Sequence, residues 1–167
     1  MYVCTKPDIA YIIGILGIFQ SNLGEAHCSA AKKVLRYLQE TKGYMLVYDR
    51  EEELELKGYT DSDLASDLDD RKSTSGYIFL LGGSAVSWKS AKQTVIATST
   101  MEVEFVACFE GMKQGVWLKN FVAKLRIVRS IQKPLTMYCD NNSAIFFAKN
   151  NKITSASRLM GVLKSLD

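Results

Sequence analysis

Histidine and proline are scarce in this chain, whose 167 residues include one histidine, two prolines and four cysteines. Because His27 is the only histidine, a hydrolase with a histidine base is disfavoured, and we expect a packing or surface role for this side chain. The cysteines include no Cys-x-x-Cys pair, so the ligand spacing of a zinc site is absent. We therefore expect free thiols in a reducing compartment and no disulfide partner.

The chain also lacks an apolar run of membrane-spanning length. The run at residues 10–19 is shorter than the ~20 residues that a transmembrane helix needs. It follows Pro7 and Asp8 rather than a cationic segment, and no small-x-small cleavage site follows it cleanly, which disfavours a signal peptide. We expect a cytoplasmic location, no membrane partner, and a helix at this run that is buried in a larger protein.

The composition is that of a folded protein without a dominant charge. Charged residues make up 23% and hydrophobic residues 47% of the chain, which argues against disorder and for a domain with a proper core. The net charge is +3 and the isoelectric point is about 8.6. This mild basicity suits a nucleic-acid surface but does not require one.

The sequence pattern of the first fifty residues predicts two helices. Periodic apolar residues indicate a second helix over about 25–40, and residues 45–48 form a short strand candidate. The charged segment 49–53 marks a boundary, after which the pattern changes to strands. We therefore expect a helical domain at 1–50, a second domain at 54–157 and a tail at 158–167.

The second domain predicts strands first and helices later. Alternation from residue 54 indicates a strand, and residues 77–81 and 85–88 flank Gly82-Gly83-Ser84, a hairpin signal because glycine supplies the positive φ of such turns. Further segments are a third strand or its extension at 94–98, a long helix at about 100–125, a strand at 135–139 and a helix at 141–149. The order βββαβα predicts an α/β (α+β) fold in which helices pack on a mixed sheet.

Three acidic residues stand where these predicted strands end or a helix begins: Asp61, Glu102 and Asp140. Taken singly, Asp61 fits a strand-end turn residue, as does Asp63, which lies two residues away on the same strand face and which the pattern does not rank against it. Asp140 fits a helix N-cap. Glu102 completes a Ser-x-x-Glu capping box with Ser99. Taken together, with no competing catalytic set, the three form a candidate site for two Mg²⁺ ions with oxygen ligands. That site indicates phosphodiester chemistry.

Glu102 and Glu104 compete for the helix position in this site. Phe105, Phe109 and Met112 recur at helical spacing, and Glu102 lies three and seven residues before the two phenylalanines. This predicts that Glu102 shares their packed face. Glu104 is rotated about 200° from Glu102 in an α-helix and should point away from the sheet. We therefore expect Glu102 in the site.

Several motifs together resemble one family. From residue 1 to about 157 the chain resembles the Pol polyproteins of copia-type LTR retrotransposons, plant copies in particular. The N-terminal matches, CTKPDIAY at 4–11 and VLRYL at 34–38, look like the end of the reverse transcriptase and its connection to an RNase H domain. The other matches are YTDSDLA at 59–65, DDRKSTSGY at 69–77, SWKSAKQ at 87–93, EVEF at 102–105 and YCDNNSA at 138–144.

The resemblance implies an RNase H-like fold that cuts the RNA strand of an RNA–DNA hybrid with two Mg²⁺ or Mn²⁺ ions. The catalytic metal ligands would be Asp61, Glu102 and Asp140, with Asp63 and Glu104 as motif neighbours. The expected partners are the hybrid and the remainder of a reverse transcriptase, and family members associate with virus-like particles. Residues near the hybrid backbone would be Arg71, Lys72, Lys89, Lys92, Gln93 and Asn141, with a solubilising basic loop as the alternative for the basic ones.

Two departures from the family pattern alter this expectation. Met101 replaces a small hydroxyl residue before Glu102. After residue 157 the family continues with a last strand and a segment that carries the fourth metal carboxylate, whereas residues 158–167 diverge and Asp167 has no motif support. We expect an RNase H-like fold without the last strand and closing helix, and impaired hydrolysis. The alternative is a catalytically inactive nucleic-acid-binding or structural remnant of the polyprotein.

Overall fold

The chain forms two compact units, divided between Val47 and Tyr48. The computed structural model describes residues 4–20, 22–48, 54–64, 71–125, 134–150 and 162–165. None of the described helices combines the length and the apolar character needed to cross a bilayer.

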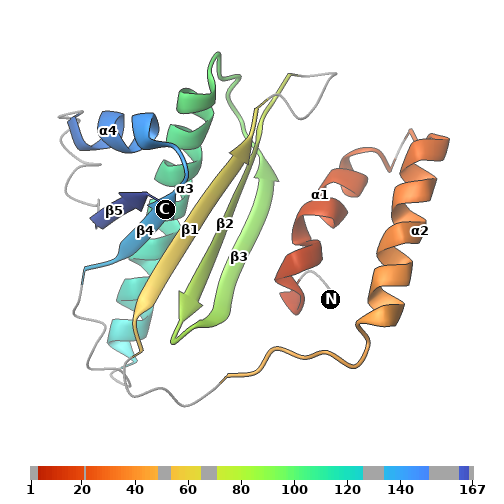
Figure 1. The fold of residues 1–167 in the computed structure, drawn as a ribbon, viewed down its shortest axis with the longest axis horizontal. Coiled ribbons are helices and arrows are strands. Elements are labelled where there is room, and N and C mark those ends of the chain that lie inside the picture. The colour runs from red at the N-terminus through yellow and green to blue at the C-terminus, as the bar shows by residue number, and fades with distance from the viewer. Residues whose placement is uncertain are drawn as a thin grey trace. The chain divides into compact units, whose positions relative to one another are not determined.

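The N-terminal unit is helical, with a 3₁₀ turn η2 (Pro7–Ile9) followed by α1 (Ala10–Ile18) and α2 (Glu25–Glu40) (Figure 1). The bounds of α2 confirm the helix predicted at 25–40. Lys6 Nζ donates to the carbonyl oxygen and to Oγ1 of Thr41, at 3.1 and 2.8 Å, and so joins the start of the unit to the end of α2. His27 packs locally, because its ring stacks on Phe19 with centroids 4.4 Å apart.

The strand predicted at residues 45–48 does not form, and that prediction is wrong. These residues have no regular secondary structure, and no described strand pairs with them. An unpaired strand leaves its N–H and C=O groups without partners, so an apolar pattern alone does not produce one.

The C-terminal unit contains a five-stranded mixed sheet with the order β3-β2-β1-β4-β5 (Figure 1). The strands are β1 (Leu56–Asp63), β2 (Thr74–Leu81), β3 (Ser84–Lys92), β4 (Thr136–Cys139) and β5 (Val162–Ser165). The first three strands pair in antiparallel fashion, whereas β4 runs parallel to both β1 and β5. This confirms the predicted α/β class, and the topology is consistent with an RNase H-like fold.

The hairpin between β2 and β3 forms where the sequence predicts it. Gly82 and Gly83 have φ angles of 56° and 75°, which a residue without Cβ adopts readily. The turn sets Leu81 opposite Ser84. By contrast, β3 ends at Lys92 and the described residues 94–98 form no strand, so the expected extension is wrong.

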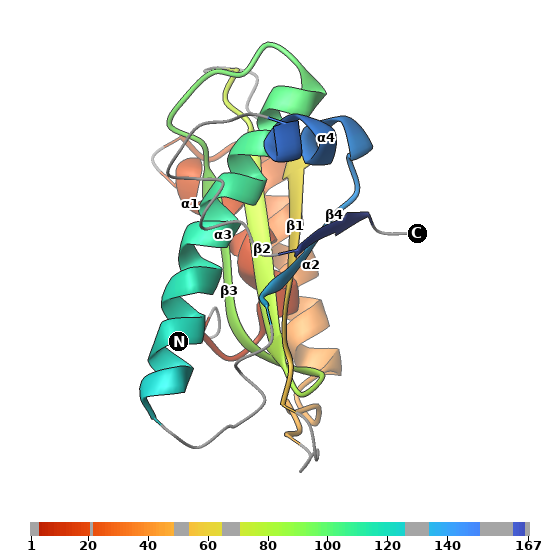
Figure 2. The ribbon, with the colours of Figure 1, turned by 90° about the vertical axis from the view of Figure 1, so that its left-hand side faces the viewer.

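The long helix α3 (Thr100–Lys124) packs along one face of the sheet, against β1 and β2 (Figure 2). Two glycines permit this close approach. A Cβ on Gly111 would lie 2.6 Å from Thr60 Cγ2, and one on Gly115 would lie 2.5 Å from Leu135 Cδ2. The core between helix and sheet includes Phe79, Met137 and Cys139, each 0% exposed. The shorter helix α4 (Asn142–Asn150) follows β4.

The expectation that the last strand is missing is wrong. Residues 162–165 form β5 and pair in parallel with β4, with Leu163 opposite Met137. The pairing needs backbone groups and an available strand edge rather than a family motif, so a divergent sequence can supply it. The described residues include no helix after β5.

Candidate metal centre

The end of β1 and the start of α3 meet at Glu104. This side chain is buried, with 5% of its surface exposed. Its Oε1 accepts two hydrogen bonds from Ser62, from the backbone N–H at 3.1 Å and from Oγ at 2.7 Å. The carboxylate is therefore held against the end of β1.

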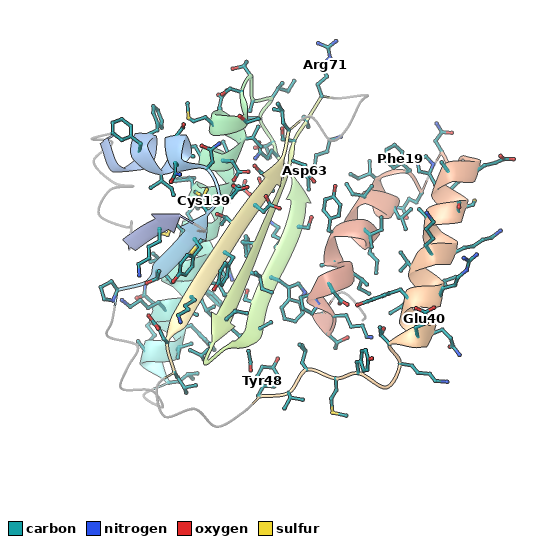
Figure 3. The ribbon with its side chains drawn as sticks, viewed as in Figure 1. Phe19, Glu40, Tyr48, Asp63, Arg71 and Cys139 are labelled. Carbon is teal, nitrogen blue, oxygen red and sulfur yellow. The ribbon has the colours of Figure 1, made fainter. Side chains whose placement is uncertain are left out.

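The end of β4 reaches the same point. Cys139 Sγ donates to Glu104 Oε2 at 3.7 Å, and Figure 3 labels Cys139 at the end of β4. One ligand atom from each of Glu104, Cys139 and Asp140 lies within 4.8 Å of the others. Asp140 is exposed, so this group opens to solvent on one side.

Asp61 joins the cluster through a shared donor. Its Oδ1 accepts a hydrogen bond of 2.8 Å from the Ser62 N–H, the same group that donates to Glu104. The carboxylates of Asp61 and Glu104 therefore lie close together, because both accept a hydrogen bond from the same backbone N–H. Asp63 is exposed at the end of β1 (Figure 3).

The electrostatics of the cluster disfavour the charge on Glu104. Burial raises the pKa of its carboxyl group, and the nearby charges of Asp140 and Asp61 raise it further, while the bonds from Ser62 and Cys139 lower it. Like charges this close are unfavourable unless a cation offsets them. The residues present fit such a cation, because carboxylate oxygens are the ligands that Mg²⁺ prefers.

Glu102 lies outside this cluster, which corrects the prediction that it faces the site. It is exposed, and its Oε2 accepts bonds from the Thr98 N–H at 2.9 Å and from Thr98 Oγ1 at 3.0 Å. These bonds lower the pKa of its carboxyl group. Its own N–H donates to Ser99 Oγ at 3.2 Å. Ser99 therefore caps the helix, which is one half of the capping-box alternative, whereas the Glu102 carboxylate bonds Thr98 rather than the N–H of the N-cap residue.

The prediction failed because it took the large aromatic side chains as the buried face of α3. Phe109 is 39% exposed, whereas Ala107 is 1% exposed. The small residues Gly111 and Gly115 are buried on the same face of α3 as Ala107. These three recur every four residues, and Glu104 precedes the first by three, which places it on their face. The spacing of small residues is the signal that identifies Glu104.

A cleft of about 400 Å³ lies beside the carboxylates. It is bordered by the end of β1 and by the starts of α3 and α4; its lining includes Ser62, Thr100, Glu104, Asp140, Asn141 and Ser143. Asn141 Oδ1 accepts from the Ala144 N–H at 3.0 Å and so caps α4. The cleft thus joins the carboxylates to the N-terminal ends of two helices, where backbone N–H groups favour anions.

The basic residues predicted to contact a nucleic acid differ in accessibility. Arg71 and Lys89 are exposed, and Arg71 points away from the sheet at the end where β1 terminates (Figure 3). Lys72 and Lys92 are half-buried. The prediction for Gln93 is wrong, because this side chain is 2% exposed and cannot reach a polynucleotide.

Comparison with known proteins shows the family. The chain is 44% identical over 149 residues to the retrovirus-related Pol polyprotein of transposon TNT 1-94 from Nicotiana tabacum. The aligned segment covers 89% of the chain and 11% of the polyprotein. It is 34% identical over 146 residues to the corresponding polyprotein of transposon RE1 from Arabidopsis thaliana, which covers 87% of the chain and 10% of the polyprotein.

A shorter relative is covered almost completely. The chain is 45% identical over 118 residues to the secreted RxLR effector protein 161 of Plasmopara viticola, which covers 71% of the chain and 83% of that protein. No protein-family model matches the chain.

The chain spans about a tenth of the length of the plant polyproteins that it matches. On this similarity, the chain belongs to the retrovirus-related Pol polyproteins of plant copia-type transposons.

Proposed function

We propose that the C-terminal unit is an RNase H-type endonuclease domain that hydrolyses the RNA strand of RNA–DNA hybrids with two Mg²⁺ ions, or Mn²⁺ in their place. One observation carries the proposal: Glu104 and Asp140 lie together beside an open cleft, and Asp61 shares the Ser62 N–H with Glu104. The family and the sheet topology support it.

In this proposal the three carboxylates hold the metal ions. Bound ions supply an activated water and stabilise the leaving oxygen of the phosphodiester. Ser62 keeps Asp61 and Glu104 oriented through its shared N–H, while Cys139 orients the second oxygen of Glu104. Glu104 therefore takes the role that the sequence assigned to Glu102.

The hybrid would lie over the cleft and the exposed basic residues. The N-terminal turn of α4, at Asn142 and Ser143, offers backbone N–H groups to a phosphate beside Asp140. Arg71 and Lys89 would contact other phosphates, which gives affinity without sequence preference. An A-like hybrid would be recognised by its shape and its 2′-OH groups.

The N-terminal unit would then be the end of the reverse transcriptase and its connection. The motif matches at 4–11 and 34–38 support this assignment. It implies that the remainder of a reverse transcriptase is a partner.

The test is cleavage of a labelled RNA–DNA hybrid by the purified chain and two matched variants. Glu104→Gln removes a carboxylate from the cluster and should lower the rate by about 100-fold or more. Glu102→Gln changes the same residue type two positions away and preserves the cap, because Ser99 Oγ accepts from the backbone N–H of residue 102, so it should cut within about threefold of the wild type. Equal loss in both variants would contradict the assignment of Glu104.

A folded chain that cuts no hybrid in Mg²⁺ or Mn²⁺ would overturn the enzymatic proposal. Salt-sensitive binding of hybrid without cleavage would then favour a catalytically inactive nucleic-acid-binding remnant. Concentration-dependent self-association without such binding would favour a structural fragment.

A further inference from the structure

Gln93 follows β3 directly and connects three elements from a buried position. Its backbone N–H donates to the Ser73 carbonyl at 2.8 Å. Its side-chain Nε2 donates to Ser75 Oγ on β2 at 2.6 Å and to the Val103 carbonyl on α3 at 3.0 Å. One amide group therefore ties the end of β3 and the start of β2 to the start of α3.

The contact on α3 lies next to the candidate metal centre. Val103 immediately precedes Glu104, and its carbonyl is part of the same helical turn. The rotation of this turn about the helix axis determines whether Glu104 Oε1 can reach Ser62, to which it is bonded at 2.7 and 3.1 Å. A fixed Val103 carbonyl therefore restrains the direction of the Glu104 side chain.

The side-chain oxygen of Gln93, Oε1, indicates what the amide group contributes at this position. Its Oε1 is buried without a hydrogen-bond partner among the residues that the structure describes. A buried acceptor without a partner is unfavourable, and an unbranched apolar side chain of similar length would fill the space without it. The benefit of the amide is therefore its two donated bonds, one of which ends beside Glu104.

We propose that Gln93 is a positioning residue whose Nε2 holds the start of α3 at the rotation that places Glu104 against Ser62. Its consequence for catalysis rests on the proposed function. The positioning itself involves only groups of this chain, so it can be measured without metal or hybrid.

The test measures hydrogen exchange at the Ser62 amide by NMR, in the absence of divalent cations. Gln93→Met keeps the length of the side chain and removes both donated bonds. We expect exchange at Ser62 to become about tenfold faster relative to the core amide of Phe79. The matched control is Gln114→Met, because Gln114 is an amide on the same helix that donates to Ser87 Oγ at 3.4 Å, away from Glu104. Exchange at Ser62 should not change in this control.

Unchanged exchange at Ser62 in a folded Gln93→Met protein would overturn the proposal and leave Gln93 with a packing role. If that variant does not fold, Gln93→Leu removes the same two donated bonds with a side chain of different shape, and it should also speed exchange at Ser62 relative to Phe79. Unchanged exchange at Ser62 in Gln93→Leu would equally overturn the proposal.

Calorimetric titration with Mn²⁺ separates this inference from the proposed function. We expect Gln93→Met to bind Mn²⁺ about tenfold more weakly than the wild type and than Gln114→Met. A wild-type chain that binds no Mn²⁺ would count against the proposed function, whereas the exchange result at Ser62 would still test the positioning of Glu104.

Discussion

Ser62 donates two hydrogen bonds to a single oxygen of Glu104, from its N–H at 3.1 Å and from its Oγ at 2.7 Å. The pair joins the end of β1 to the start of α3, and the N–H also serves Asp61. The carboxylates are thus held in place by the protein before any cation arrives, which lowers the reorganisation needed on binding. The unfavourable charge that results leads to the first two predictions.

The stability of the unfilled site should decrease with pH because of Glu104. Burial raises the pKa of this carboxyl group in the folded chain above its ordinary value of 4.5. Its contribution to stability is therefore complete below that value and is lost as the pH rises through the raised pKa. Without divalent cations, Glu104→Gln should melt near the wild-type temperature at pH 4 and above it at pH 7.5.

The control for this prediction is Glu102→Gln, which should behave in the opposite way. Bonds from Thr98 lower the pKa of Glu102, so its contribution is present above the ordinary value and lost as the pH falls. Thermal melts of both variants over this pH range check the sign. A difference between Glu104→Gln and wild type that does not vary with pH would contradict the account of Glu104.

Mg²⁺ should stabilise the folded chain. A ligand that binds only the folded state at about 100 times its Kd adds about 2.7 kcal/mol, which raises the melting temperature on the order of 8 °C for a domain of this size. Glu104→Gln and Asp140→Asn should lose most of this shift, and EDTA should reverse it in the wild type. Glu102→Gln should keep it, because Glu102 lies outside the cluster. The same shift in all three variants would exclude the proposed ligands.

Gly111→Ala should destabilise the C-terminal unit. The added Cβ would lie 2.6 Å from Thr60 Cγ2 and 3.0 Å from Met137 Cε, and overpacking of this kind costs about 1–3 kcal/mol. The better helix propensity of alanine offsets about 1 kcal/mol of that cost. Chemical denaturation measures the net loss.

The control is Gly17→Ala, which makes the same change in α1, where the added Cβ meets nothing within 4 Å. It should stabilise its helix by about 0.5–1 kcal/mol. A stabilising effect at Gly111 would show that α3 does not approach the sheet as closely as described.

Two of the four cysteines should be protected from thiol reagents. Cys4 and Cys28 are exposed, whereas Cys108 and Cys139 are buried. A hydrogen bond with Cys139, together with burial, also raises the pKa of the Cys108 thiol, so little reactive thiolate forms there. Ellman's reagent should label two thiols rapidly in the native chain and four in denaturant. Four rapid reactions in the native chain would contradict the described burial.

Local patterns were sufficient for several elements. The apolar period of α2 and the glycine turn between β2 and β3 depend on neighbours in sequence, and both formed where predicted. The positions of Asp61, near the end of β1, and of Asp140, directly after β4, were also predicted from sequence, because the ends of buried strands lie at the edge of the sheet whatever else packs there. The family motifs extended this information across the chain.

Other features depended on contacts between distant segments. Glu104 rather than Glu102 enters the cluster because α3 approaches the sheet along Ala107, Gly111 and Gly115, and close backbone approach selects small residues over large aromatic ones. Gln93 is buried because it bridges β2 and α3. Strand β5 exists because β4 offers an edge to pair with. A one-dimensional pattern records the size and polarity of each residue, but which face of a helix is buried is set by the shape of the surface that it meets.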